Sequence, residues 1–258
     1  MKKTGLVVAG FGMCFLLAGC QSSGGSSYKE KHYEGTGDVQ TLEIADDNIK
    51  INVVGVSSEQ PLTIDYYESK NVTYTINDDN NKLSIKKKKQ SFGWNIFSLF
   101  NWNFEDIEVT VQVPENQLKN LTVKTENGKI VVENLTVGEA KLKTTNGKLL
   151  LEDTQAKNSL KLETTNGKVE MANVQAKDIK IDTTNAKITF DQLLVEDSFK
   201  AETTNGKISG TIEGSQRDFK IDSKTTNGDN SLSNSESGSK DLKLKTTNGA
   251  IRVDFSED

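Results

Sequence analysis

The sequence predicts an all-β protein: a parallel β-solenoid, or β-helix, with rungs of about 20 residues and an irregular β portion before them. The first observation behind this prediction is a motif, Thr-Thr-Asn-Gly or a close variant, that returns through the second half of the chain. The intervals between its Asn residues are 19, 20, 19, 20, 22 and 21 residues, and such a period is typical of stacked repeats. The Asn residues are Asn127, Asn146, Asn166, Asn185, Asn205, Asn227 and Asn248.

The second observation is that apolar and polar residues alternate on both sides of the motif, as they do in half-buried strands. In the third rung, Leu160 and Leu162 alternate with charged residues before the turn, and Val169 and Met171 resume the alternation after it. Gly follows Asn in every copy except the one with Ala186. Because Asn and Gly tolerate positive φ, we expect the chain to turn at Asn-Gly in that conformation.

Aligning the rungs gives three columns of apolar residues, which we expect to face the core. The first column is Leu121, Ala140, Leu160, Ile179, Phe199, Phe219 and Leu242. The second is Val123, Leu142, Leu162, Ile181, Ala201, Ile221 and Leu244, and the third, past the turn, is Ile130, Leu149, Val169, Ile188, Ile208 and Ile251. The rungs fit either a parallel solenoid or a series of antiparallel hairpins. The likeness of the residues in each register favours the solenoid, since parallel stacking places like on like about 4.8 Å apart.

Composition excludes several classes of function. The chain has 258 residues, a net charge of −5 and a single His, His32. It therefore lacks the basic excess of a nucleic-acid-binding protein and most of the ligands of a zinc or His-based catalytic site. The motifs of serine hydrolases, zinc proteases, P-loop proteins and calcium-binding β-rolls are also missing from the sequence. We expect no enzymatic activity, no cofactor, no metal and no nucleic-acid partner.

The start of the chain has the pattern of an exported lipoprotein. Residues 1–19 read as a signal peptide, and their end, Leu17-Ala18-Gly19-Cys20, matches the lipobox of bacterial lipoproteins. By that resemblance Cys20 becomes the lipidated N-terminus, and its acyl chains (palmitate among them) hold the protein at the extracytoplasmic face of the cell membrane. Residues 20–27 add a Ser/Gly tether to this anchor.

Residues 28–115 show strand signals without the repeat, and residues 116–258 hold the repeats. We expect the first region to begin or cap the same solenoid, although a separate small sandwich also fits. Within it, residues 90–104 form an aromatic insertion with Trp94, Phe97, Phe100 and Trp102. This insertion either covers the open end of the solenoid core or contacts the membrane or a partner.

Two columns of lysines face outward. One contains Lys141, Lys161, Lys180, Lys200, Lys220 and Lys243, with acidic residues in adjacent positions. The other follows the turn and consists of Lys129, Lys148, Lys168, Lys187 and Lys207. Either column could be an ordinary solvated surface, or it could hold an anionic polymer of the cell envelope. The second column has fewer acidic neighbours in the sequence, so it is the better candidate for binding.

The lipobox, the lead-in that ends Ile107-Glu-Val-Thr-Val-Gln-Val-Pro114, and the serial T-x-N-G-K rungs resemble the bacterial "putative adhesin" domain family of unknown function, found in LiaG-like cell-envelope lipoproteins. The likeness spans about Thr41 to Phe255. It implies a β-solenoid at the cell surface and supplies no catalytic residues. We therefore expect a non-enzymatic surface solenoid that binds or scaffolds envelope components, with a role in adhesion or envelope stress. Binding of an anionic cell-wall polymer through the lysines, contact with another envelope protein, and a carbohydrate-active enzyme are the alternatives.

Overall fold

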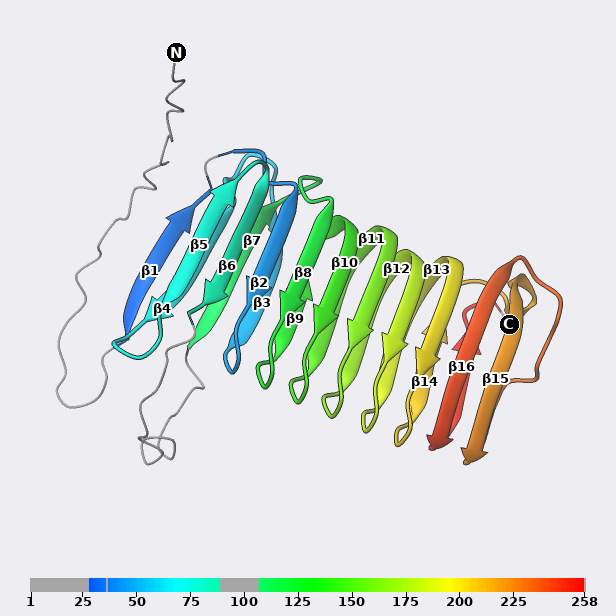
Figure 1. Cartoon of the computed structure of the whole chain (residues 1–258). Helices are drawn as coiled ribbons and strands as arrows, with labels where there is room; N and C mark the ends of the chain where they lie inside the picture. The colour runs from blue at the N-terminus through cyan, green and yellow to red at the C-terminus, as the bar shows by residue number, and fades with distance from the viewer. Residues whose placement is uncertain (1–27, 36, 89–106, 258) are drawn as a thin grey trace, which may run out of the picture.

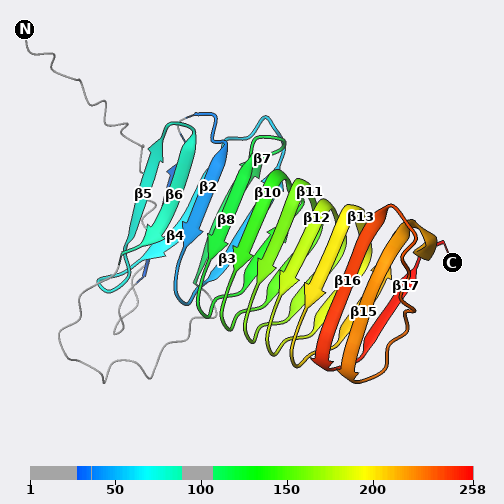
Figure 2. The same ribbon diagram turned by 45° about the vertical axis from the view of Figure 1, so that its right-hand side comes forward.

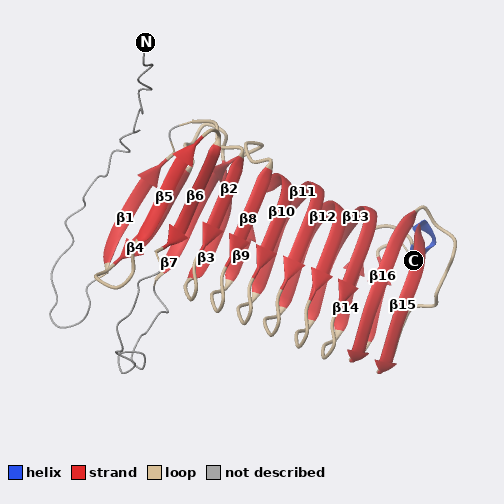
Figure 3. Ribbon diagram, viewed as in Figure 1, coloured by secondary structure: helices blue, strands red, loops and turns tan. Residues whose placement is uncertain are grey.

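The computed structural model describes residues 28–35, 37–88 and 107–257, and they form a flattened parallel β-solenoid with two faces (Figure 1). Almost every regular element is a strand (Figure 3). The front sheet of Figure 1 contains, in spatial order, β5 (Tyr74–Asp79), β6 (Lys82–Lys87), β2 (Thr41–Ala45), β8 (Asn120–Lys124), β10 (Thr136–Lys143), the later parts of β11 (Leu149–Glu163), β12 (Val169–Asp182) and β13 (Ile188–Glu202), then β16 (Lys240–Asn248) and β15 (Phe219–Asn227).

The rear sheet contains β1 (Lys29–Glu34), β4 (Thr63–Glu68), β7 (Glu108–Pro114), β3 (Lys50–Val56), β9 (Ile130–Glu133), the first parts of β11, β12 and β13, then β14 (Ile208–Ile212) and β17 (Ile251–Phe255). Among the described strands, every pairing is parallel except β1–β4, β4–β7 and β5–β6. The parallel solenoid is therefore confirmed over the alternative of antiparallel hairpins.

The core lies between the two sheets and consists of the predicted columns. The third column is in register from Ile130 to Ile251, and all its side chains are fully buried. The first two columns are also confirmed, except in one strand. Ile221, not Phe219, pairs with Leu242, so the predicted register of β15 is wrong by two residues. An even shift keeps the same side chains inward, and Phe219 is still buried.

The expected reason for the motif glycines is wrong. Among the described residues, the glycines with positive φ are Gly210, Gly214 and Gly238, and none of these belongs to the motif. The motif glycines are required by close approach of neighbouring rungs. A Cβ added to Gly167 would lie 1.6 Å from the carbonyl oxygen of Gly147, and the other five motif glycines meet the neighbouring rung at 1.8–2.2 Å. Positive φ occurs at the opposite corner of the rungs, in residues such as Asn134 and Asp153.

The last two rungs are exchanged in space relative to their order in the chain. After β14 a short 3-10 helix, η2 (Gln216–Asp218), leads into β15, which forms the end of the front sheet (Figure 2). The chain then returns, and β16 fits between β13 and β15. The exchange places Leu244 beside Ala201 in the core, and moves Ser223, which occupies the corresponding position of β15, to the end of the stack. There the Ser223 Oγ donates to Asn230 Oδ1 at 3.0 Å, so a buried hydroxyl is satisfied.

The stack continues without a break into the first half of the chain. β2 pairs with β8 and β3 pairs with β9, so residues 41–56 form a rung that lies directly on the first motif-containing rung. Cys20, the tether and the aromatic insertion with Trp94, Phe97, Phe100 and Trp102 lie outside the described residues. Among the residues that are described, no helix is long and apolar enough to cross a membrane.

Candidate binding edge

The turns between the front and rear sheets line up along one edge of the solenoid, and a continuous ladder of asparagine side chains runs along it. Each Nδ2 donates to the Oδ1 of the neighbouring rung over 2.6–2.9 Å. Seven such bonds join eight residues, in spatial order Asn48, Asn127, Asn146, Asn166, Asn185, Asn205, Asn248 and Asn227. All seven bonds point in the same direction, so the ladder holds neighbouring turns in one register.

The first Thr of the motif supports the turn from inside. Thr144 is 2% exposed, and its Oγ1 accepts from Gly147 N at 3.0 Å. The same hydroxyl donates to Gly128 O of the neighbouring rung at 3.4 Å. The buried threonine therefore satisfies the backbone of the tight turn and ties it to the next one.

Beside the asparagine ladder lies the second lysine column, which we call the lysine row: Lys129, Lys148, Lys168, Lys187 and Lys207. These lysines occupy successive rungs, because the backbone N–H of the residue after each of the first four bonds to the carbonyl of the next lysine at 2.9–3.1 Å. In this row Lys148 pairs with Glu170 at 2.5 Å. The other four, Lys129, Lys168, Lys187 and Lys207, have no ion pair with any residue that the structure describes.

Two residues of this edge were not predicted from the sequence, Lys50 beside the lysine row and Asn48 in the asparagine ladder. Ile51 N donates to the carbonyl oxygen of Lys129, which places Lys50 next to the start of the lysine row, and Asn48 begins the asparagine ladder. A signal for both exists, since Asn48-Ile49-Lys50 has the same Asn-x-Lys spacing as Asn127-Gly128-Lys129. It was hidden because Ile49 replaces the motif glycine. Lys50 is neutralised by Glu108 at 3.0 Å, so it extends the row without adding an unpaired charge.

The other predicted lysine column lies on the front sheet and is neutralised. Lys161 and Lys143 both bond to Glu163, at 2.7 and 3.0 Å, and this pair of bonds lowers the pKa of Glu163 to about 2. Lys180, Lys200 and Lys243 each pair with an acidic residue at 3.0–3.2 Å. Lys220 is out of register with the column and pairs with Glu236. This surface is a network of compensated charges, which agrees with the alternative of an ordinary solvated surface and not with a binding surface for anions.

A shallow groove of about 240 Å³ lies between the front-sheet network and the asparagine ladder. Its lining residues come from three consecutive rungs and are Lys143, Thr144, Thr145, Glu163, Thr164, Thr165, Asp182, Thr183 and Thr184. Hydroxyls and paired charges line it, so it can exchange hydrogen bonds with a polar ligand.

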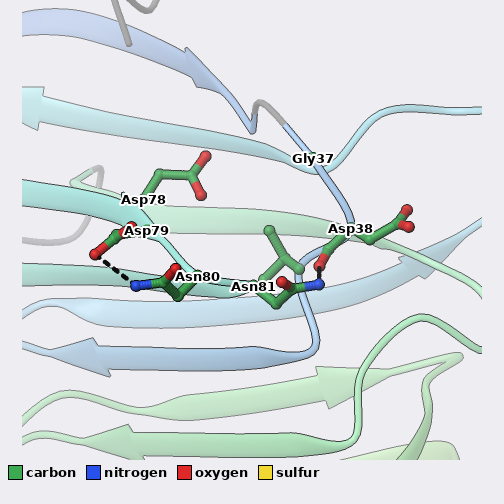
Figure 4. A pocket seen from close by; sticks show the side chains of 7 residues that line it. Gly37, Asp38, Asp78, Asp79, Asn80 and Asn81 are labelled. Carbon is green, nitrogen blue, oxygen red and sulfur yellow. Dashed lines mark hydrogen bonds between the residues drawn. The ribbon is translucent and has the colours of Figure 1, made fainter. Parts of the chain in front are cut away.

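A second hollow, of about 260 Å³, lies between the turn that joins β5 to β6 and the segment that precedes β2 (Figure 4). Asp38, Asp78 and Asp79 line it together with Asn80 and Asn81. Asn81 Nδ2 donates to the Asp38 carbonyl at 2.8 Å, and Tyr33 donates to Asp78 at 2.8 Å. In the part of the chain that the structure describes, no group of His, Cys, Asp and Glu side chains is arranged to hold a metal ion.

The edge combines positive charges with side chains that can hydrogen-bond to a ligand. The lysine row places a lysine in five successive rungs, four of them without an ion pair among the described residues, and the exposed asparagine carboxamides and second threonines of the motif offer hydrogen bonds alongside it. The rungs are about 4.8 Å apart, which is less than the screening length of about 8 Å at physiological salt, so neighbouring lysines act on a ligand together.

Solved structures with a similar fold come from several bacteria. A "putative adhesin" from Bacteroides fragilis is 14% identical, with a TM-score of 0.46, over 89% of this chain and 98% of that one. A "putative cell adhesion protein" from Clostridium sporogenes is also 14% identical, with a TM-score of 0.38, over 89% of this chain and 100% of that one. A "putative adhesin" from Parabacteroides merdae is 12% identical, with a TM-score of 0.40, over 90% and 98%.

No curated protein matches the chain. The pattern of one protein family, Toastrack DUF4097, matches residues 39–258, which include every rung from β2 to β17. The predicted resemblance to a bacterial domain family of unknown function is thereby confirmed, and the chain belongs to the Toastrack DUF4097 family.

Proposed function

We propose that this protein is a non-enzymatic, lipid-anchored solenoid at the extracytoplasmic surface that binds an anionic polymer of the cell envelope along the lysine row. Cys20 and the tether are its proposed attachment to the membrane, and the stacked rungs hold the binding edge rigid. The observation that carries the proposal is the run of lysines in successive rungs, four of which have no ion pair among the described residues.

Such a row of lysines is unfavourable in the absence of a ligand. Like charges in stacked turns about 4.8 Å apart repel one another. The front-sheet lysines avoid this cost through Glu163, Asp182 and their equivalents, whereas four of the five lysines of the row do not. A polyanion that follows the row would neutralise the repulsion at several rungs together, each contact contributing roughly 1 kcal/mol.

The overall charge of the protein supports a local rather than a general attraction. The chain carries a net charge of −5, so a polyanion is repelled by the molecule as a whole. Binding must therefore depend on the lysine row and must weaken steeply as salt concentration rises. A neutral glycan would show neither dependence.

The experiment measures binding of the full-length chain to a teichoic-acid-type poly(glycerol phosphate) over a range of salt concentrations. The test variant is Lys168→Glu/Lys187→Glu, which reverses two exposed, unpaired lysines in consecutive rungs. The matched control is Lys157→Glu/Lys177→Glu, which reverses two exposed lysines in consecutive rungs near the opposite edge. Both variants have the same net charge.

We expect the test variant to lose at least about tenfold in affinity, because two contacts of about 1 kcal/mol each become repulsive. The control should stay within about twofold of the native protein, because the front-sheet segments 159–163 and 178–182 separate its changes from the row. At about 3.3 Å per residue, such a segment is longer than the screening length of about 8 Å. Equal losses in both variants would reduce the interaction to net charge, and no loss in the test variant would rule out the lysine row as the binding surface.

A further inference from the structure

The six Asn-Gly pairs of the motif are chemically reactive as well as structural. In such a pair the Gly backbone nitrogen can attack the Asn Cγ, ammonia leaves, and a succinimide ring forms. Water from the solvent then opens the ring to give Asp or isoAsp. Gly favours this reaction because it has no side chain to hinder ring closure and is conformationally free. The six pairs begin at Asn127, Asn146, Asn166, Asn205, Asn227 and Asn248.

The solenoid protects most of these pairs. The carboxamides of Asn127, Asn146 and Asn166 are bonded on both sides within the ladder. In the same three turns the Gly nitrogen donates to the buried Thr Oγ1 at 3.0–3.2 Å. Both reacting atoms are thus held in hydrogen bonds, which must open before the nitrogen can reach the carboxamide.

Two further pairs are protected in part. Asn205 and Asn248 also have carboxamides bonded on both sides. Gly249 N donates to the Asn227 carbonyl at 3.2 Å, whereas Gly206 N has no hydrogen bond to a described residue. Neither glycine is as exposed as the one at the end of the stack.

The pair Asn227–Gly228 lacks both kinds of protection, because β15 is the last strand of the front sheet. Asn227 Nδ2 donates to Asn248 at 2.8 Å, but no described residue donates to its Oδ1. Gly228 N has no hydrogen-bond partner among the described residues, and Gly228 is the one exposed glycine of the six. The chain after Gly228 bonds to the neighbouring rung again only from Asp229 onward, where Ile251 N donates to the Asp229 carbonyl at 2.8 Å.

We propose that Asn227–Gly228 is a site of spontaneous deamidation, at which Asn227 is converted to Asp or isoAsp before the other five Asn-Gly pairs react. The exchange of the last two rungs creates this site. It leaves β15, and not the rung that ends the chain, with a one-sided place in the asparagine ladder.

The modification acts on the strand that carries it. A carboxylate at position 227 loses the Nδ2 donor and lies against the Oδ1 of Asn248, so the last ladder bond becomes a repulsive contact. IsoAsp also inserts an extra backbone carbon where Asn227 pairs with Asn248. Both changes loosen β15, which otherwise covers the edge of β16 in the front sheet.

The experiment follows deamidation of the full-length chain in mildly alkaline buffer at growth temperature. Peptide mapping by mass spectrometry measures each of the six sites, and enzymatic methylation of isoAsp provides an independent readout. The same measurement in concentrated urea gives the rates without the fold. In the folded protein we expect Asn227 to react about ten- to hundredfold faster than Asn146 and Asn166. At those two sites the hydrogen bond to the Asn Oδ1 and the one from the Gly nitrogen must open first, and opening both bonds slows the reaction by about this factor. In urea the six rates should converge.

The consequence for β15 is tested with Asn227→Asp, and Asn227→Gln is the control that keeps a side-chain amide. Amide hydrogen exchange should accelerate in residues 219–227 of Asn227→Asp and remain close to native in Asn227→Gln. Similar folded-state rates at Asn227, Asn146 and Asn166 would overturn the assignment of the site. Unchanged exchange in Asn227→Asp would overturn the loosening of β15.

Discussion

The steric role of the motif glycines leads to a quantitative prediction for Gly167→Ala. An added Cβ would lie 1.6 Å from Gly147 O and 2.4 Å from Gly147 C. Both atoms belong to the backbone of the neighbouring rung, which is held by strand pairing on both sides of the turn, so they cannot move independently. Overpacking of this kind costs about 1–3 kcal/mol. For a domain of this size that corresponds to a fall in Tm of about 2–12 °C.

The protein itself shows how such a turn adapts. At the fourth of the seven motif turns Ala186 replaces Gly, and the hydrogen bond from the residue-186 nitrogen to the first Thr is absent there, while Thr183 is less buried than Thr164. Gly167→Ala should therefore fold, but with the loss of the bond from Gly167 N to Thr164. This loss alone accounts for about 1 kcal/mol of the expected cost.

The assay is thermal unfolding followed by far-ultraviolet circular dichroism, with Gly37→Ala as the matched control. A Cβ at Gly37 meets no atom within 4 Å, so this variant makes the same chemical change without the contact. We expect a Tm near the native value for the control, or slightly above it because Ala restricts the unfolded chain. If both variants shifted Tm equally, close approach between rungs would not be the reason for the motif glycines.

Three further predictions concern polar side chains. The pKa of Glu163 falls from 4.5 to about 2 in the folded protein, so its ion pairs stabilise the fold above pH 4.5 and are lost as pH falls toward 2. Glu163→Gln should therefore reduce the loss of stability between pH 4.5 and pH 2 by less than about 1 kcal/mol. An acid-unfolding transition identical to that of the native protein would contradict the assignment. Asn166→Ala removes two ladder bonds and Asn227→Ala removes only one. In urea unfolding, Asn166→Ala should therefore lower the free energy of unfolding about twice as much as Asn227→Ala, by up to about 1–3 kcal/mol. Equal losses would mean that the ladder does not stabilise the stack. Tyr74→Phe removes the hydroxyl that donates to Oδ2 of the buried Asp46 at 2.7 Å. It should lower the urea midpoint by an amount equivalent to about 1–3 kcal/mol. A midpoint equal to that of the native protein would show that solvent replaces the phenol.

Much of the candidate site follows from the sequence, because the repeat places each residue type at a constant position in every rung. Once the rungs are parallel, the period alone brings Lys148, Lys168 and Lys187 into one row and the asparagines into one ladder. The sequence does not say which lysines are neutralised. That depends on which side of the sheet each faces and on acids in adjacent rungs, as Glu170 shows for Lys148 and Glu163 for Lys161.

By itself, the sequence determined the fold class, the length of a rung, the core columns outside β15 and the position of the turns, since alternation and period are local properties of the chain. The tertiary structure alone decided that β16 lies between β13 and β15 and that residues 41–56 form a rung of the same stack. It also decided that the motif glycines are required because a carbonyl oxygen of the neighbouring rung leaves no room for a Cβ. These features depend on which strand edges meet, and parallel strands of nearly identical sequence can meet in more than one order. The choice between them rests on side chains far apart in the chain, such as Leu244, which fills the core beside Ala201, and Ser223, which is satisfied at the end of the stack.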